Sequence, residues 1–139
     1  MSDIDSAIAR LQDLVLACTD IKHAPDYPIE DAAVLPAAIA HVRSGESKAD
    51  DATAYRSLDV LNVDVHFARM FMKDTYTRIN RFVPEFTSRL AGDPTLNGTV
   101  DTIVFPVSYE VAPAQWDSVT TQMVQFSITV KTRNTSVST

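Results

Sequence analysis

The chain has 139 residues and a hydrophobic content of 45%, which suits one hydrophobic core and is too little for two full domains. Twelve basic residues against eighteen acidic ones give a net charge of -6, which excludes the broad basic surface typical of nucleic-acid-binding proteins. The single Cys18 cannot form an intrachain disulfide. The start of the chain is acidic where a signal peptide would be basic, and residues 32–40 span about half of a bilayer-crossing helix. We therefore expect a soluble protein of a reducing compartment that is not secreted by the common route and has no membrane partner.

The N-terminal third predicts a helix, a connector and a strand. The helix has an apolar stripe at helical spacing: Ile4, Ile8, Leu11, Val15 and Cys18. We expect it to end near Asp20, because Pro25 and Pro28 hold the following residues extended. Residues 34–42 read as a short apolar strand, and Pro36, which has no N–H to donate, favours the edge of a sheet.

The next region predicts a hairpin. Residues 44–53 are polar and carry both signs of charge, as a mobile hairpin loop does. A strand follows, with alternating apolar residues Leu61, Val63, Val65 and Phe67. In a regular strand, Leu58 and Val60 would point to the opposite face from Leu61 and Val63. We therefore expect a β-bulge near Val60 and Leu61 that restores a single apolar face.

The second half of the chain predicts helical structure followed by two strands. Apolar residues recur by threes and fours over residues 70–90, and Pro84 divides this stretch into two expected helices by opening the second one. Gly92, Asp93 and Pro94 should end it. Alternating residues at 103–111 and 124–130 predict an antiparallel hairpin.

Together these elements predict an α+β fold with a mostly antiparallel four-stranded sheet and helices packed on one face. Residues 112–121 are expected to link the last two strands, and the polar residues from Lys131 onward to form a tail. We place one domain at residues 1–133 and a flexible C-terminal tail at 134–139. The side chains expected in the core are Phe67, Phe82, Phe86, Phe105, Phe126 and Ile128.

No pattern for catalysis, a cofactor or a metal ion is present in the sequence. The three glycines cannot form a phosphate-binding loop or a dinucleotide fingerprint, and the three histidines lack metal-ligand spacing. Ser108 and Ser127 lie at polar strand positions without a nucleophile motif. His66 shares a strand face with Asp64, which is more typical of a polar strand face than of a site. We expect a protein that is not an enzyme.

Other residues are candidates for contacts with partners. Basic residues gather in one helical region: Arg69, Lys73, Arg78, Arg81 and Arg89. They could face phosphates, solvate the outer face of a helix, or pair with an acidic neighbouring copy. For the last case, the expected pairs join Arg78 and Arg81 to an acidic loop containing Glu46, Asp50 and Asp51. The remaining candidates are Tyr27 and Trp116, large aromatics in proline-containing segments that could instead staple their own loops to the domain.

The order of these segments resembles the tail terminator, or tail completion, proteins of long-tailed bacteriophages. The resemblance covers nearly the whole chain, and the segment most specific to these proteins is the turn at residues 93–100. The segments that carry it are HAPDYPIEDAAVLPAAIAHVRSG, LDVLNVDVHFAR, SRLAGDPTLNGTV and VQFSITVKT.

The resemblance implies a structural virion protein without cofactor or catalytic residues. Its copies would form a ring, typically a homohexamer, that caps the tail tube, ends tail polymerisation and joins the tail to the head connector. Double-stranded DNA would pass through the lumen without specific binding, and the ring would be assembled in the cytoplasm of the bacterial host. The alternatives are a head-side neck protein (a stopper or connector subunit), a cellular α+β ligand-binding module, or an enzyme with a dispersed site.

Overall fold

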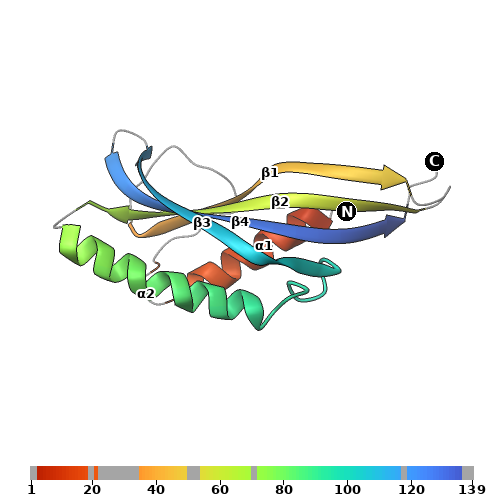
Figure 1. The fold of residues 1–139 in the computed structure, drawn as a ribbon, viewed down its shortest axis with the longest axis horizontal. Coiled ribbons are helices and arrows are strands. Elements are labelled where there is room, and N and C mark those ends of the chain that lie inside the picture. The colour runs from red at the N-terminus through yellow and green to blue at the C-terminus, as the bar shows by residue number, and fades with distance from the viewer. Residues whose placement is uncertain are drawn as a thin grey trace.

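The computed structural model describes residues 3–18, 21, 35–49, 54–69, 72–116 and 119–135. The elements in chain order are α1 (Asp3–Leu16), β1 (Ala37–Ala49), β2 (Ala54–Ala68), α2 (Met72–Ala91), β3 (Thr102–Trp116) and β4 (Val119–Thr135). The strands form one antiparallel sheet in the order β1-β2-β4-β3, and both helices lie on one face of it (Figure 1). The predicted α+β fold is confirmed, as is the edge position of the first strand.

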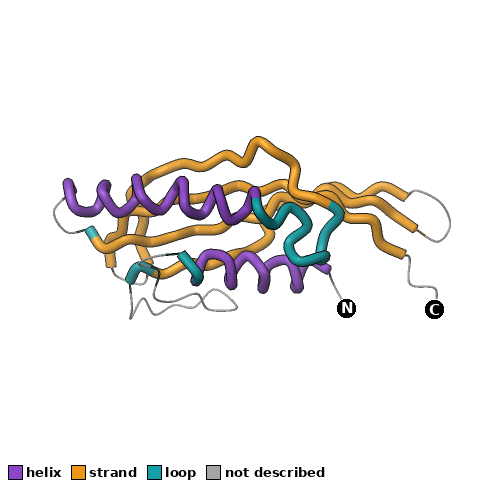
Figure 2. The backbone as a smooth tube through the Cα atoms, turned by 90° about the horizontal axis from the view of Figure 1, so that it is seen from below, coloured by secondary structure: helices purple, strands orange, loops and turns teal. Residues whose placement is uncertain are grey.

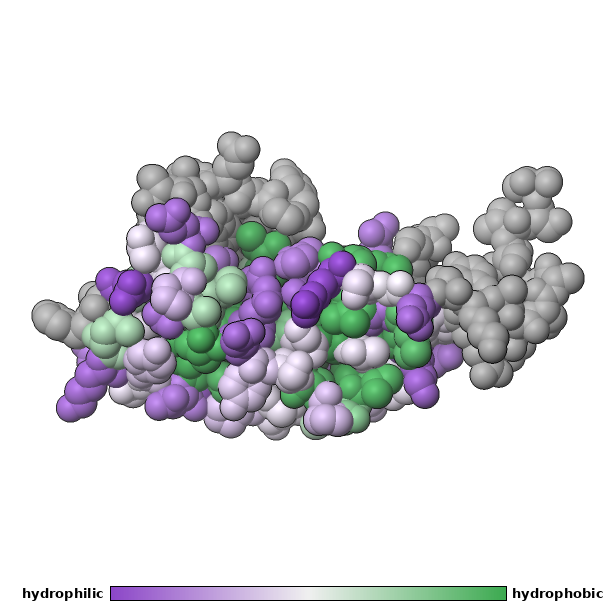
Figure 3. Space-filling view, turned by 45° about the horizontal axis from the view of Figure 1, so that its top comes forward, coloured by the Kyte–Doolittle hydropathy of each residue, from purple (hydrophilic) through white to green (hydrophobic). Residues whose placement is uncertain are grey.

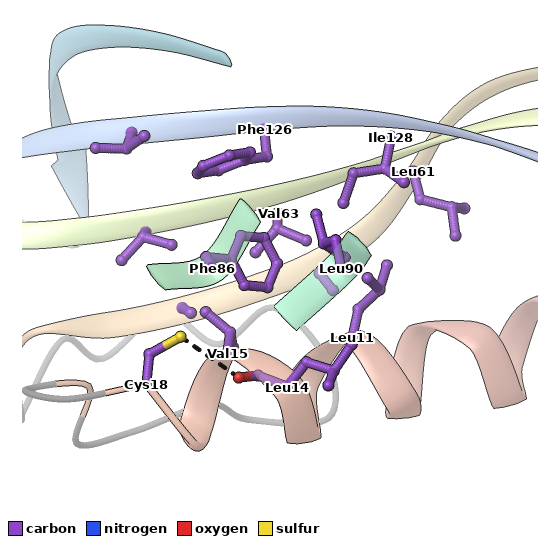
Figure 4. Packing of buried hydrophobic residues seen from close by; sticks show 14 of the residues in the cluster. Leu11, Leu14, Val15, Cys18, Leu61, Val63, Phe86, Leu90, Phe126 and Ile128 are labelled. Atoms are coloured by element: carbon purple, nitrogen blue, oxygen red, sulfur yellow. Dashed lines mark hydrogen bonds between the residues drawn. The ribbon is translucent and has the colours of Figure 1, made fainter. Parts of the chain in front are cut away.

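The hydrophobic core lies between the two helices and the sheet (Figure 4). The expected alternation in β2 is confirmed: Leu61, Val63, Val65 and Phe67 are all buried. The rings of Phe86 in α2 and Phe126 in β4 meet edge to face, with centroids 4.9 Å apart. On the other side, the backbone N–H of Ala40 in β1 donates to Oε1 of Gln12 in α1 at 2.8 Å. The helices therefore hold β1, β2 and β4 together.

The break expected at Pro84 is wrong, because α2 is one helix with Pro84 inside it. The buried stripe of α2 is continuous across the proline: Ile79, Phe82, Phe86 and Leu90. Pro84 itself is exposed, so the carbonyl group of Asn80 that loses its helical N–H partner lies on the water-facing side. Packing of the stripe against the sheet outweighs the local cost of the proline.

The hairpin loop expected at residues 44–53 is mostly wrong. β1 continues to Ala49 and pairs with the start of β2, while residues 50–53 lie outside the described structure. The bulge lies at the expected level of the sheet but in the other strand, between Val42 and Ser44 of β1. β2 is paired with β4 without interruption, so Val60 simply faces away from the helices.

The expected link and tail are also shorter than the sequence indicated. β3 runs to Trp116 and β4 begins at Val119, so Pro113 lies inside β3, which tolerates it because β3 is an edge strand. At its other end β4 continues to Thr135, with residues 131–135 paired to the first residues of β2. The polar composition of residues 131–135 predicts a tail, but their backbone pairing with β2 makes them part of the strand.

The result is a three-stranded arm that extends past the helices, seen at the right of Figure 1. We define the arm as residues 44–49 of β1, 54–60 of β2 and 129–135 of β4, which pair across the sheet in this order. Figure 2 shows the same overhang from the helix side. The helices thus cover only part of the sheet.

Phe105 is the one expected core residue that lies outside the core. Its side chain is 46% exposed, whereas the other five are buried. In β3 the register shifts between Val104 and Ser108, so that three residues face the single Ile128 of β4. This bulge lies on an edge strand, and Phe105 is exposed although Ile103 before it is buried and Val107 after it packs against the core.

Phe126→Ala should lower the free energy of unfolding by about 3–5 kcal/mol, because it removes a buried ring that contacts Phe82, Phe86 and Tyr109. The matched change Phe105→Ala should cost less than about 1 kcal/mol, because that ring is already half exposed. Denaturant unfolding of both variants at the same low protein concentration measures the difference. Equal losses would contradict the assignment of the core.

Candidate assembly surfaces

The two open edges of the sheet are poor templates for another strand. β3 contains Pro106 and Pro113, and each removes one N–H donor from this edge. β1 has the bulge before Ser44, and the N–H of its Ala40 already donates to Gln12. Edge strands are commonly protected in this way against backbone pairing between molecules. Backbone pairing with a partner is therefore hindered at these positions of both edges.

A shallow hollow lies on the arm, on the sheet face away from the helices. Its volume is about 380 Å³, and it is lined by Ser44, Gly45, Glu46, Leu58, Val60 and Thr129. Leu58 is 41% exposed, and it lies between Glu46 of β1 and Lys131 of β4 in the sheet. Figure 3 shows the sheet from this side, with hydrophilic and hydrophobic side chains interleaved. Of the acidic residues expected in contacts, Glu46 lies at this hollow, whereas Asp50 and Asp51 lie outside the described residues.

Gly45 shapes the arm through a close approach to a buried carboxylate. Asp59 of β2 is only 6% exposed, and Oγ of Ser57 donates a hydrogen bond of 2.7 Å to its Oδ2. A Cβ atom at Gly45 would overlap Oδ1 of Asp59 and would lie 3.2 Å from the carbonyl oxygen of Leu58. Only a residue without a side chain therefore fits beside Asp59.

Gly45→Ala should destabilise the protein by about 1–3 kcal/mol, because the new methyl group must displace Asp59. Gly92→Ala is the matched control: an added Cβ there comes no closer than 3.5 Å to its neighbours, so the change should stay within about 0.5 kcal/mol. Thermal unfolding of the two variants gives the comparison, and a Gly45→Ala protein as stable as the control would show that the arm is packed differently.

Three of the basic residues of α2, the arginines, divide into two groups. Nη2 of Arg89 donates to the carbonyl oxygen of Ala17 at 3.1 Å and lies 3.8 Å from Oε2 of Glu85, so Arg89 joins α2 to the end of α1. Arg78 and Arg81 are exposed and line a second hollow of about 270 Å³, together with Ala68, Asp74, Thr75 and Thr77.

Arg78 and Arg81 cannot reach Glu46 within one subunit. Their hollow includes Ala68 at the end of β2, whereas Glu46 pairs with Leu58 near its start. Ten residues of extended strand separate these positions, which is about 33 Å. Pairing of these arginines with an acidic neighbour stays a prediction. Trp116 pairs with Val119 at the turn between β3 and β4, and Tyr27 lies outside the described residues.

The sheet face away from the helices carries a hydrogen-bonded network. The Asp64 carboxylate accepts a 2.8 Å hydrogen bond from Nε2 of Gln125 at Oδ1, and its Oδ2 lies 3.0 Å from Nε2 of His41. Nδ1 of His66 lies 2.7 Å from the hydroxyl oxygen of Thr121. These contacts run across β1, β2 and β4 and tie the strands together.

Sequence reasoning placed His66 and Asp64 on one face, which is confirmed, but missed their partners. His41 and Gln125 are brought to Asp64 by the register of β1 and β4, for which the sequence holds no local signal. In the part of the chain that the structure describes, no three side chains of the metal-binding types gather closely enough to hold an ion. His41, Asp64 and Gln125 are held by hydrogen-bonding contacts between neighbouring strands.

Burial lowers the pKa of the His66 imidazole below its ordinary value of 6.5, and the nearby Asp64 carboxylate only partly opposes this effect. The unfolded chain therefore binds a proton near pH 6.5 that the folded protein takes up only at lower pH. The free energy of unfolding should fall as the pH drops below about 6.5. Asp93 does not contribute in this pH range. Partial burial raises the pKa of its carboxyl group, but the hydrogen bond from Arg10 lowers that pKa below the ordinary value of 3.8.

His66→Gln should flatten the dependence of stability on pH between about 7 and 5, because it removes this difference in proton binding. Denaturant titrations at several pH values measure the slope for both proteins. An unchanged slope in the variant would show that His66 is not the responsible group.

No known protein family matches the sequence, and no curated protein matches it significantly. Within the described helices, none is long and apolar enough to cross a membrane. The surfaces described above and the order of the elements are therefore the features from which a function is inferred.

Proposed function

We propose that this chain is a structural subunit of a bacteriophage tail, a tail terminator whose copies form a ring, typically of six. The ring caps the tail tube, ends its polymerisation and joins the tail to the head connector. The single observation that carries the proposal is the presence of exposed apolar side chains at two unlike places. One is the hollow around Leu58 and Val60 on the arm, and the other is β3, where Phe105 and Tyr109 are about half exposed.

Unlike surfaces favour a ring over a symmetric dimer. A two-fold dimer needs one self-complementary patch, whereas a heterologous contact joins two different patches and repeats in one direction until it closes. The hollow lies on β1, β2 and β4, and the exposed aromatic residues lie on β3 at the opposite edge. This separation allows each copy to contact two neighbours at once.

The turn at residues 93–100 gives local support. Its backbone is left-handed at Leu96, Asn97 and Gly98, with φ values of 47°, 58° and 80°. Oδ1 of Asp93 accepts a 2.9 Å hydrogen bond from the N–H of Asn97, and its Oδ2 accepts one of 2.7 Å from Arg10 of α1. The segment that most resembles tail terminators is thus a defined turn fixed to the first helix.

The charge of the chain suits a ring through which DNA passes. At a net charge of -6, most of the surface offers no attraction to phosphates, and each neutralised phosphate would add a salt-dependent hold on the DNA. A subunit with few phosphate contacts lets DNA slide. Arg78 and Arg81 are a local exception, and they line their hollow together with Asp74.

Added to growing tail tubes, the protein should bind one end of each tube and stop elongation at a defined length. Electron microscopy of negatively stained tubes, with and without the protein, measures the length distribution and the position of the cap. Tubes of unchanged length with bare ends would contradict the proposal. Labelling on the head connector with none on tubes would instead indicate a head-side neck protein.

A further inference from the structure

We infer that the arm of one copy binds across helix α1 of the next copy through opposite charges. The inference rests on the proposed function, because it takes a second copy of this chain in the ring as the partner. The two surfaces are a row of three basic residues on the arm and the exposed face of α1 that carries Asp5 and Asp13.

The register of the strands places the three basic residues side by side. Lys48 of β1 pairs with Arg56 of β2, and Arg56 pairs in turn with Arg133 of β4. We call these residues the basic row. Arg56 stands two positions before Leu58 in an uninterrupted strand, so the row belongs to the sheet face away from the helices. Like charges directly opposite one another destabilise a sheet, and an acidic partner would offset this cost.

The next row of the arm adds to the excess of basic residues. It consists of Glu46, Leu58 and Lys131, so the two rows together hold four basic positions and one acidic one. The rest of the chain has the opposite balance, with eight basic residues against seventeen acidic ones. A second copy therefore offers the arm an acidic surface, whereas most of the subunit would repel DNA.

Helix α1 matches the basic row in size. Asp5 and Asp13 are exposed and lie eight residues apart, which puts them on one face of the helix and about 12 Å apart along its axis. The outer positions of the basic row are two strand spacings apart, which is about 10 Å. A helix laid across the three strands therefore brings one carboxylate to each end of the row.

The remaining side chains of this helix face favour the contact. Arg10 is the one basic residue in the sequence of α1, and its Nε already donates to Oδ2 of Asp93 at 2.7 Å. Leu16, which shares the helix face with the two aspartates, is 47% exposed. Because Leu58 on the arm is 41% exposed, both surfaces combine charges with apolar area.

One subunit cannot form this contact by itself. α1 lies on the helix side of the sheet, where Gln12 accepts a hydrogen bond from Ala40, whereas the basic row belongs to the opposite face (Figure 1). The contact must therefore join two copies. Because its two surfaces differ, each pair leaves one surface of each kind free, and the contact repeats in one direction, as a ring requires.

The test is an exchange of charges in the full chain. Arg56 at the centre of the row lies within one strand spacing of either end. Arg56→Glu and Asp13→Arg should each weaken association at least about 10-fold, because each places like charges opposite one another in the contact. The double variant Arg56→Glu/Asp13→Arg restores opposite charges between neighbours and should recover most of the wild-type affinity. Sedimentation at salt concentrations of about 0.05 and 0.5 M measures association, which should be weaker at the higher one.

The control variant is Lys73→Glu, which changes the net charge as much as Arg56→Glu but lies at an exposed position of α2. It should assemble like the wild type. A second measurement is thermal unfolding at a concentration where the subunits are separate. Arg56→Glu should unfold at the wild-type temperature or above it, because it removes one of three neighbouring like charges. A lower temperature would show that Arg56 is balanced within its own subunit, which overturns the inference.

The other outcomes separate this contact from the proposed function. If the wild type caps tail tubes as a ring but both single variants assemble normally, or the double variant does not recover, the contact is wrong and the function stands. If Lys73→Glu weakens assembly equally, net charge alone is responsible and the contact is overturned. Binding of a duplex DNA probe that Arg56→Glu abolishes, with ring formation unchanged, would assign the row to nucleic acid instead. A wild type that stays monomeric in solution and on tubes overturns both proposals.

Discussion

The difference in length between helices and strands is the constraint on which the rest of the structure depends. At 1.5 Å per residue, α1 and α2 span about 21 and 30 Å, whereas the 15 residues of β2 span about 50 Å. Neither helix alone can cover such a sheet from end to end, and both stop short of the arm (Figure 1). Their aromatic and aliphatic side chains therefore build one dense core around Phe86 and Phe126, and the sheet continues past it as the arm.

Exposed apolar side chains lie at two separate places on the sheet. Leu58 lies on the arm, on the face away from the helices, and Phe105 and Tyr109 lie on the edge strand β3, where Tyr109 also contacts Phe126 of the core. The sheet edges themselves are protected by prolines, a bulge and the contact of Gln12 with β1. Specific side-chain contacts are thus favoured over indiscriminate strand pairing, as an assembly with a fixed number of subunits requires.

Much of the fold could be predicted from periodicity. The alternation over residues 61–67 and the helical stripe from Ile79 to Leu90 correspond to one buried face each, and these patterns gave the fold class and the face covered by helices. The failures share one cause. At Pro84, along residues 44–49 and after Lys131, tertiary pairing or packing outweighs the local signal.

The candidate surfaces were less accessible to sequence reasoning. Glu46 could be named as a candidate from its charge, but the hollow beside it depends on the register that pairs Glu46 with Leu58 and Thr129 with Val60. Phe105 has the alternation of a core residue, and only the bulge in β3 excludes it. Register and bulges arise from contacts between distant segments, so a single sequence holds little local signal for them.

The central claim is that two unlike surfaces on each subunit close a ring. The most direct measurement is the mass of the assembly in solution and on tube ends, by native mass spectrometry and mass photometry. A closed ring is a single species with a whole number of subunits greater than two, and six is the number expected for a tail terminator. A two-fold dimer as the largest specific species, or a monomer at every concentration, would contradict it.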